Sequence, residues 1–370
     1  MSASSAAGRV PGWVSVVLVP AANLVLALLF SAVVVLLVGE SPLRALRILM
    51  AGAFGNAEAV GYTLYYATNF VFTGLAVAVA FHGGLFNIGA EGQANIGGLA
   101  VTLLCLGAGG WPSALVIPAA IVAAAAGGAA WAFVPAWLQA KRGSHVVITT
   151  IMFNFIAAAL MTHLLVNVLI KPGQQSPETR ELDPNTWLPQ LHDAFRWLGG
   201  DMGQSPLNLS ALFAIAAGVL VWFYLWHTRW GYELRALGHN ETAAVYAGIS
   251  PARTIIVAMS ISGALAGLMA LNEVLGVHHR LLLNMPGGAG YVGIAVALMG
   301  RNHPVGIALA AILFGALYQG GSELSFDMPK LTRDMVVVIQ GLIILVCGAL
   351  EDALRRPIEA LLRRPARAGA

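Results

Sequence analysis

The sequence predicts an all-α integral membrane protein with about ten transmembrane helices. Of its 370 residues, 58% are hydrophobic and only 10% are charged, whereas soluble domains carry about 25% charged residues. The mean hydropathy is +0.77, and long apolar runs recur along the whole chain. A water-soluble protein of this length could not bury so much apolar surface, so lipid must surround most of it.

Each predicted span is an apolar run close to the roughly 20 residues that a helix needs to cross the hydrocarbon core. The clearer runs are 13–38, 61–80, 113–135, 145–170, 208–227, 254–272, 304–320 and 332–350. Two further runs, 86–108 and 287–300, are apolar but broken by glycines and polar residues. The first run is too long for a signal-peptide core and lacks a convincing cleavage site, so we expect it to be retained.

The basic residues predict the orientation. With the N-terminus inside the cell, the inner segments carry twelve Lys and Arg residues and the outer segments carry eight. This bias favours two cytoplasmic termini, and it explains the net charge of +3 without a nucleic-acid partner. The predicted organisation is a cytoplasmic tail at 1–12, a transmembrane region at 13–350 with a long outer loop at 171–207, and a basic cytoplasmic tail at 351–370 that contacts lipid.

The first broken run gathers polar residues at membrane depth. The segment HGGLFNIGAEGQANIGGLA at 82–100 contains Asn87, Glu91, Gln93 and Asn95 among several glycines. A buried carboxylate in a bilayer costs several kcal/mol unless it is paired or wetted, so Glu91 must face protein or a water-filled path. The cluster as a whole predicts proximity to a transport path. For each residue singly, hydrogen bonding that only holds helices together stays an open alternative.

The second broken run, PGGAGYVGIAVALMG at 286–300, resembles the first in spacing and glycine content. In the predicted topology the two runs cross the membrane in opposite directions, which is typical of inverted-repeat transporters. Asn154, in the run HVVITTIMFNF, is a further polar candidate inside a span.

One inner segment, RWGYELRALGHNETAAVYAGISPAR at 229–253, is too polar to span the membrane. Gly238 marks a predicted break, and Asn240 can cap a short helix over 241–248. Gly248 ends this helix, and Pro251 prevents its continuation. Such a helix suits docking into a groove of a partner protein, while a simple interfacial turn remains the alternative.

Several chemistries find little support in the residues. Cys105 and Cys347 lie in apolar runs and predict neither a disulfide nor a metal site. His278 and His279 are adjacent, but no further ligands have suitable spacing for a metal. An intramembrane enzyme would need a pair such as Ser262 with His163, and no GxSxG motif is present. No GxxxxGK[ST] phosphate loop occurs either, so an ATP-driven process would need ATP, Mg²⁺ and the ATPase on another polypeptide.

The runs GLFNIGAEGQANIGGLA, VVITTIMFNFIA, GHNETAAVYAGI, GVHHR and GIAVALMGRNHPVG, in this order, resemble the permease family of ABC transporters. The resemblance covers roughly residues 60–350. It is nearest to importers of sugars, nucleosides and branched-chain amino acids, and among these to the nucleoside type. The sequence departs from many relatives at Glu241, where they carry proline, and at 281–285.

The resemblance implies a type II importer permease in the bacterial inner membrane. Two permeases, identical or paralogous, would pair with two ATPase subunits and an external substrate-binding protein. It also implies that 238–248 is the coupling helix that the ATPase receives, with contacts from Gly238, His239, Asn240, Glu241, Ala243, Ala244 and Gly248.

The expected mechanism is alternating access, in which the broken segments around Glu91 and Gly290 change the side to which they open. Asn87, Glu91, Gln93, Asn95 and Asn154 would line the path weakly, because tight binding slows release. Sugar or amino acid cargo stays open. So does an ion-driven secondary transporter with Glu91 as proton carrier.

Overall fold

The computed structural model describes residues 18–171, 173–197 and 203–349. The chain divides into two compact units, 1–52 with 320–370 and 53–319, and each is considered by itself. The regular structure of the described residues is helical, with three isolated β-bridges and no strand. The predicted tails at 1–12 and 351–370 lie outside the described residues.

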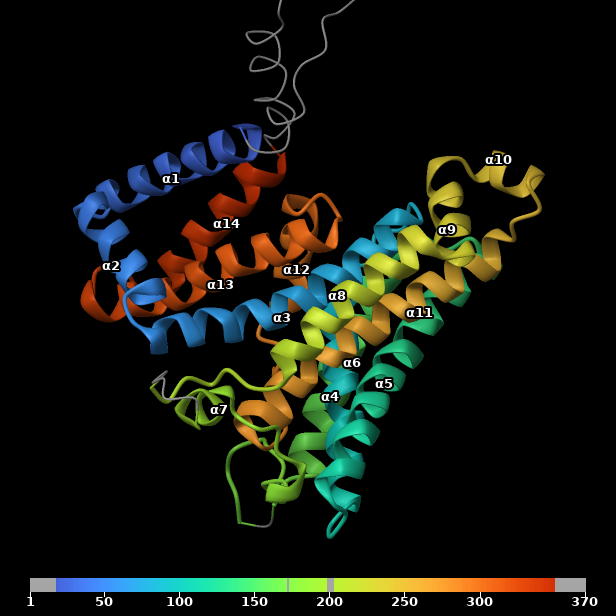
Figure 1. Ribbon diagram of the computed structural model, residues 1–370, viewed down its shortest axis with the longest axis horizontal. Coiled ribbons are helices and arrows are strands. Elements are labelled where there is room, and N and C mark those ends of the chain that lie inside the picture. Colours follow the sequence, from blue (N-terminus) through green and yellow to red (C-terminus); the bar gives the residue numbers. More distant parts are fainter. Residues whose placement is uncertain (1–17, 172, 198–202, 350–370) are drawn as a thin grey trace, which may run out of the picture. The chain divides into compact units, whose positions relative to one another are not determined.

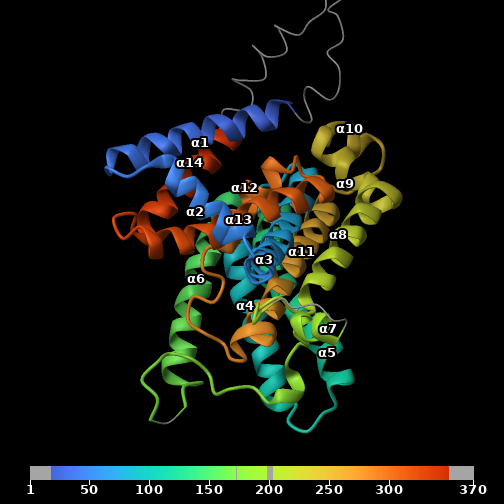
Figure 2. The same ribbon diagram turned by 60° about the vertical axis from the view of Figure 1, so that its left-hand side comes forward.

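Figures 1 and 2 show the helices in chain order. Their bounds are α1 Val19–Leu37, α2 Pro42–Phe54, α3 Ala57–His82, α4 Ala90–Gly107, α5 Ser113–Arg142, α6 Val146–Asn167, α7 Leu191–Trp197, α8 Ser210–His227, α9 Arg229–His239, α10 Glu241–Tyr246, α11 Pro251–Ala270, α12 Ala289–Met299, α13 Pro304–Asp327 and α14 Arg333–Ala349. A 3-10 turn, η2 (Pro184–Thr186), and a π-helical segment, η3 (Leu271–His278), complete the described elements.

Every predicted span contains a helix, but not all of these helices could cross a membrane alone. Six described helices are long and apolar enough, or seven spans if the bent pair α1 and α2 counts as one. The predicted number of about ten is therefore approximate. Among the remainder, α12 has 11 residues and so rises only about 16 Å, half of the hydrocarbon thickness. In both broken runs the helix begins only after an irregular segment, α4 at Ala90 with 18 residues and α12 at Ala289 with 11.

The segment after the first span differs from the prediction, which left it as an outer loop. It forms α2, and the chain bends by 117° between α1 and α2. Gly39 has a left-handed backbone with φ +79°, and Pro42 then begins the new helix. Since proline is well tolerated at the first position of a helix, this glycine and proline place a sharp corner where composition alone suggested a connecting loop.

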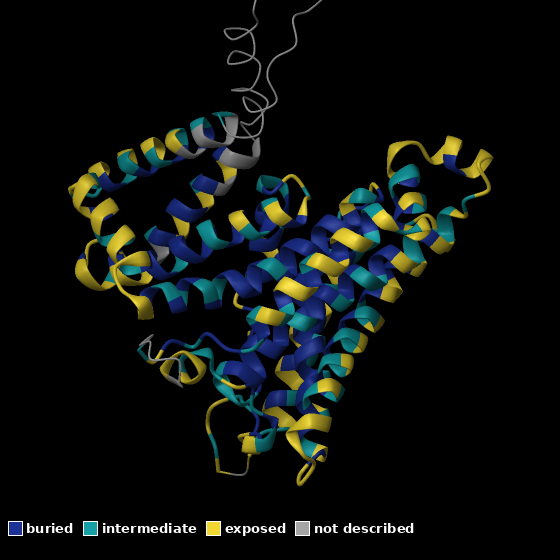
Figure 3. Ribbon diagram, viewed as in Figure 1, coloured by how far each residue is buried: buried dark blue, intermediate teal, exposed yellow. Residues whose placement is uncertain are grey.

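Within the unit 53–319, α3 and α11 lie inside and α5, α6 and α8 lie outside. The apolar windows of α3 and α11 are 78% and 61% buried, compared with 22–28% for the other three. Figure 3 shows the exposed residues along the outward faces of α5 and α8. Large apolar side chains such as Phe155 of α6 and Leu220 of α8 are also exposed. These faces need lipid as their solvent.

Small residues let α5 and α11 approach closely. A side chain added at Gly128 would meet the backbone of Gly263, and one added at Gly267 would meet the carbonyl of Ala124. Packing through small residues is the usual way in which membrane helices associate, because van der Waals contact replaces the hydrophobic driving force there. The glycines at the contact between α5 and α11 therefore serve close packing.

The loops of this unit gather at two opposite ends. At one end, Arg180 donates to the carbonyl of Leu106, Asn185 donates to the carbonyl of Trp111, and the Leu188 N–H donates to the carbonyl of Leu275. We call this the loop end, and α7 lies there (Figure 1).

At the opposite end, the His82 ring bonds the carbonyl of Asn302 at 3.1 Å, and Gly84 lies against Gly238. We call this the α10 end. The grouping agrees with the predicted alternation of spans, in which the loops near 110, 171–207 and 273–286 share one side and those near 84, 229–253 and 302 share the other.

The other unit is held by α1 against α14 and by the packing of α2 on the end of α13. Gly320 lies against the backbone of Leu49, and Lys330 pairs with Glu40 at 3.6 Å.

Candidate functional site

The two broken helices begin at the same place inside the unit. From there α4 runs to the loop end, where the carbonyl of Leu106, near its last residue, accepts from Arg180. The other helix, α12, runs to the α10 end, where Asn302, just after its last residue, bonds the His82 ring through its carbonyl. They therefore run in opposite directions, as predicted. Gly290 lies directly on the backbone of Glu91, so that any side chain at this position would collide with it. We call the meeting of these two N-termini the junction.

The Glu91 carboxylate closes the junction. Gly288 N–H donates to Oε1 and Gly290 N–H donates to Oε2, each at 2.8 Å. Gly288 is the N-cap residue of α12 and Gly290 lies in its first turn, where backbone N–H groups have no partner within the helix. Glu91 is 7% exposed, so a side chain of α4 caps α12. The cap depends on Gly288, whose φ of +89° favours glycine.

A second group of bonds surrounds the start of α4. Asn87 is fully buried; its Nδ2 donates to Gln93 Oε1 at 2.9 Å and to Ser262 Oγ at 2.8 Å. Its Oδ1 accepts from Gln93 Nε2 at 3.2 Å and from Gly89 N–H at 2.8 Å. This network links α4 to α11 and satisfies the irregular backbone before the helix, as burial requires.

Asn154 brings α6 into the same junction. Its Oδ1 accepts from Gly92 N–H at 2.9 Å, and its Nδ2 donates to the carbonyl of Ile88 at 2.8 Å. It also donates to the Tyr291 hydroxyl at 3.3 Å. Asn95 donates to the carbonyl of Glu91 at 3.2 Å, while its buried Oδ1 has no partner within the described part of the chain.

The structure thus brings together all five residues predicted near the path, namely Asn87, Glu91, Gln93, Asn95 and Asn154. Most of their polar atoms bind other protein atoms. Their contact with cargo stays a prediction.

Sequence reasoning missed a second polar cluster, toward the loop end. Glu273, in η3, accepts from the Tyr65 hydroxyl at 2.7 Å and from Asn69 Nδ2 at 2.5 Å, both on α3. His278 Nε2 lies 3.2 Å from its other oxygen. Residues five apart lie about 140° apart around an α-helix. The pairing of Glu273 with His278 therefore depends on the π-helical backbone, whose turns repeat at i to i+5.

Asn272 extends this cluster. Its Nδ2 donates to Asn69 Oδ1 at 2.8 Å, and its Oδ1 accepts from Asn208 and Ser210 at 2.8 Å each. The signal in the sequence was the pair Asn272 and Glu273 at the end of a span, facing Tyr65 and Asn69 spaced four apart in another. The partners could not be read from the sequence because they are about 200 residues apart.

The segment 229–253 is more helical than predicted. The short helix appears as α10, and Asn240 caps it by accepting from Ala243 N–H at 2.9 Å. Gly248, with φ +82°, follows its end. The predicted break at Gly238 is wrong, since this residue lies inside α9 and the break falls at Asn240. Glycine is needed at 238 because a side chain would collide with the carbonyl of His82.

The residues predicted to couple to an ATPase lie in the exposed hairpin of α9 and α10, at the α10 end (Figure 1). Ala244 is buried, whereas Gly238, His239, Asn240, Glu241, Ala243 and Gly248 are exposed. Two apolar side chains are also presented to the outside, Val245 at 52% and Tyr246 at 90% exposure. Coupling to a partner stays a prediction for these residues.

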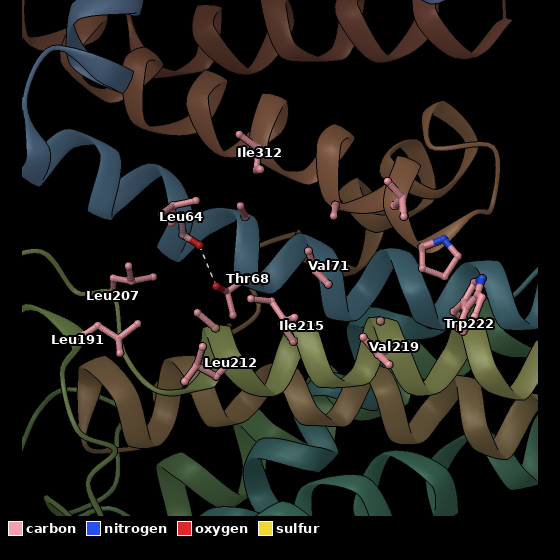
Figure 4. A pocket seen from close by; sticks show the side chains of 17 residues that line it. Leu64, Thr68, Val71, Leu191, Leu207, Leu212, Ile215, Val219, Trp222 and Ile312 are labelled. Atoms are coloured by element: carbon pink, nitrogen blue, oxygen red, sulfur yellow. Dashed lines mark hydrogen bonds between the residues drawn. The ribbon is translucent and has the colours of Figure 1, made fainter. Parts of the chain in front are cut away.

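An apolar groove of about 580 Å³ lies between α3, α8 and α13. Figure 4 shows Leu64 and Val71 of α3 facing Ile215 and Val219 of α8. Only Thr68 and Trp222 bring polar side-chain atoms to its lining, and the Thr68 hydroxyl donates to the carbonyl of Leu64. The groove has little to offer a polar solute, which would need several converging polar groups.

The described residues contain no group of three His, Cys, Asp or Glu side chains suited to a metal. Ser262 is buried between Asn87 and the carbonyl of Ala76, to which it donates at 2.6 Å. His163 is exposed on α6 and lies near Asn167.

Buried broken helices that meet inside a bundle of lipid-facing spans define a multi-pass membrane transport protein. The chain belongs to the family described as branched-chain amino acid transport system, permease component, whose profile matches residues 59–347. This confirms the predicted class, the permease subunit of an ABC importer, and makes the chain a transport component.

Curated relatives match along most of the chain. The guanosine ABC transporter permease protein NupP of Bacillus subtilis is 36% identical over 327 residues, which cover 87% of this chain and 91% of that protein. The nucleoside ABC transporter permease protein NupB of Lactococcus lactis is 34% identical and covers 84% and 85%. The glucose ABC transporter permease protein TsgB13 of Haloferax volcanii is 31% identical and covers 91% and 88%. No solved structure gives a significant match.

Proposed function

We propose that this chain is the permease subunit of a nucleoside importer in a bacterial cytoplasmic membrane. The observation that carries the proposal is the identity of 34–36% to a guanosine permease and a nucleoside permease over more than four fifths of the chain. The chemistry of the junction is compatible with this cargo, because amide side chains predominate there and can exchange hydrogen bonds with uncharged polar groups.

A separate ATPase, which binds ATP and Mg²⁺, supplies the energy through α10. The support is geometric, because Val245 and Tyr246 are apolar and exposed at the tip of a capped helix. An exposed aromatic side chain is a common anchor in a partner's pocket. The α10 end then faces the cytoplasm, both termini are cytoplasmic, and the loop end receives the external substrate-binding protein. A second permease, identical or paralogous, completes the complex.

Transport proceeds by alternating access. Movement of α10 with the ATPase changes the packing of α9 against the turn at 82–84, which leads directly into the irregular segment before α4. The junction then opens toward one side or the other. Asn87, Gln93, Asn95 and Asn154 provide weak polar contacts along the path during this change.

The test is uptake of labelled guanosine by proteoliposomes that contain the complete transporter with its ATPase and binding protein. We expect ATP-dependent uptake that excess unlabelled nucleosides abolish and that glucose, ribose and leucine leave unchanged. Tyr246→Ala should lower uptake at least several-fold without lowering the thermal stability of the permease, since this side chain is 90% exposed.

The second candidate cargo is a sugar, because TsgB13 is 31% identical over 91% of this chain. Competition by glucose, with no effect of nucleosides, would replace the first proposal by this one. Uptake under an ion gradient without ATP would overturn both in favour of a secondary transporter.

A further inference from the structure

The two helix N-termini at the junction carry partial positive charges that must be balanced inside the protein. Glu91 stands at the second position of α4, and its carboxylate binds the first turn of α12. Each helix N-terminus is equivalent to roughly +0.5 elementary charge because the peptide dipoles add along the axis. Two N-termini that meet within a few residues therefore place about one positive charge at a site buried from water.

None of the other side chains that bond within the junction supplies the balancing charge. The bonds of Glu91 run to backbone N–H groups, and Asn87, Gln93 and Asn154, which complete the junction, are neutral. Both carboxylate oxygens act as acceptors, which is the arrangement that an ionised carboxylate satisfies best. One negative charge on Glu91 then balances the two helix ends.

We propose that ionised Glu91 is a positioning residue of the transport path, the internal counter-charge that holds the N-terminus of α12 against that of α4. The proposal rests on the proposed function only in giving the path its purpose. Without the charge, α12 loses the cap for two backbone amides and its N-terminus is repelled by that of α4. The junction then opens or becomes disordered, although the helices themselves remain.

The experiment exploits the space that Glu91→Ala leaves. This variant removes the carboxylate but keeps the two N–H donors of Gly288 and Gly290. A small anion of the same chemistry, formate, can enter the vacated position, while formamide has a similar size and no charge. The first readout is the thermal unfolding midpoint of the purified permease, which requires neither cargo nor ATPase, and the second is uptake by the complete transporter.

We expect Glu91→Ala to unfold several degrees below the wild type and to transport poorly. Formate should restore most of the lost midpoint and part of the uptake, and formamide at the same concentration should restore neither. Glu91→Gln fills the space but brings an amide donor toward an N–H donor, so it should be destabilised and insensitive to formate. This variant keeps the proposal testable if Glu91→Ala does not fold.

Glu58→Ala is the matched control. Glu58 stands at the same second position of its own helix, α3, but it is exposed. The Glu58→Ala variant should have nearly the wild-type unfolding midpoint and show no response to formate. Equal effects of formate and formamide, or a wild-type midpoint for Glu91→Gln, would overturn the proposal. If the wild-type transporter took up no nucleoside while the unfolding midpoints responded to formate as expected, that result would instead count against the proposed cargo.

Discussion

Two carboxylates are buried in the same unit, and they are held in different ways. Glu91 accepts its bonds from the backbone of α12. Glu273 accepts its bonds from the side chains of Tyr65 and Asn69, with His278 beside it. Both are less than 10% exposed, so both need partners.

The partners of the two carboxylates differ in whether they can change their hydrogen-bonding role. A backbone N–H is a donor in every circumstance, whereas a hydroxyl, an amide or an imidazole can rotate, flip or change tautomer. The junction therefore tolerates only an acceptor at position 91. The cluster around Glu273 can rearrange around a neutral substitute. A rigid junction and an adaptable outer cluster are thus built from the same residue type.

The largest effect should come from filling the junction itself. Gly290→Ala adds a methyl group where the backbone of Ala90 and Glu91 already lies. Overpacking against backbone costs about 3 kcal/mol when nothing can move aside. The free energy of unfolding should fall by about this amount, and uptake should be lost. Gly218→Ala on α8, where nothing lies within 4 Å of the added group, is the control and should be neutral or slightly stabilising. Similar stability of both variants would show that the junction is loosely packed.

The next effect compares the two carboxylates directly. Glu91→Gln should cost about 2 kcal/mol because a buried N–H donor is left facing another donor. Glu273→Gln should cost less than about 1 kcal/mol, since its oxygen still accepts from Tyr65 and Asn69. Chemical denaturation of both variants in the same detergent measures the difference. Equal losses would remove the distinction between backbone and side-chain partners.

The smallest effect concerns pH at the loop end. Burial lowers the pKa of His279, which stacks on Trp187 with ring centroids 3.9 Å apart. Glu181, His278 and Arg280 are the titratable neighbours of this ring. Because the folded pKa lies below the unfolded value of about 6.5, the folded protein holds the neutral ring. This stability is present above pH 6.5 and is lost as the pH falls through the folded pKa.

The comparison is His279→Asn, because asparagine tolerates the left-handed backbone of this residue, φ +53°. We expect the wild type to lose more stability than the variant between pH 7 and pH 5. Unfolding midpoints that change in parallel over this interval would contradict the assignment to His279.

Much of the fold and part of the site follow from local patterns. Continuous apolar runs predicted the long helices α3, α5, α6, α8 and α11, since length and hydropathy are properties of a segment. The broken run at 82–100 predicted a cluster of polar residues for the same reason. The break at Gly238 was wrong because a glycine also serves close packing, and α9 uses it against the chain at 82–84. The corner between α1 and α2 was missed because α2 has only 13 residues and carries Arg44 and Arg47, so it does not form an apolar run long enough to be read as a span.

The sequence by itself determined that this protein is surrounded by lipid, where its spans lie, that two of them are interrupted, and that polar residues gather in the first interrupted run. These are consequences of side-chain transfer into a bilayer and of backbone propensity, both of which act locally. Only the tertiary structure decided that Glu91 caps a helix almost 200 residues away and that Glu273 is held by α3. Each of these pairings depends on which helices pack together, and many helix pairs are equally apolar before they meet.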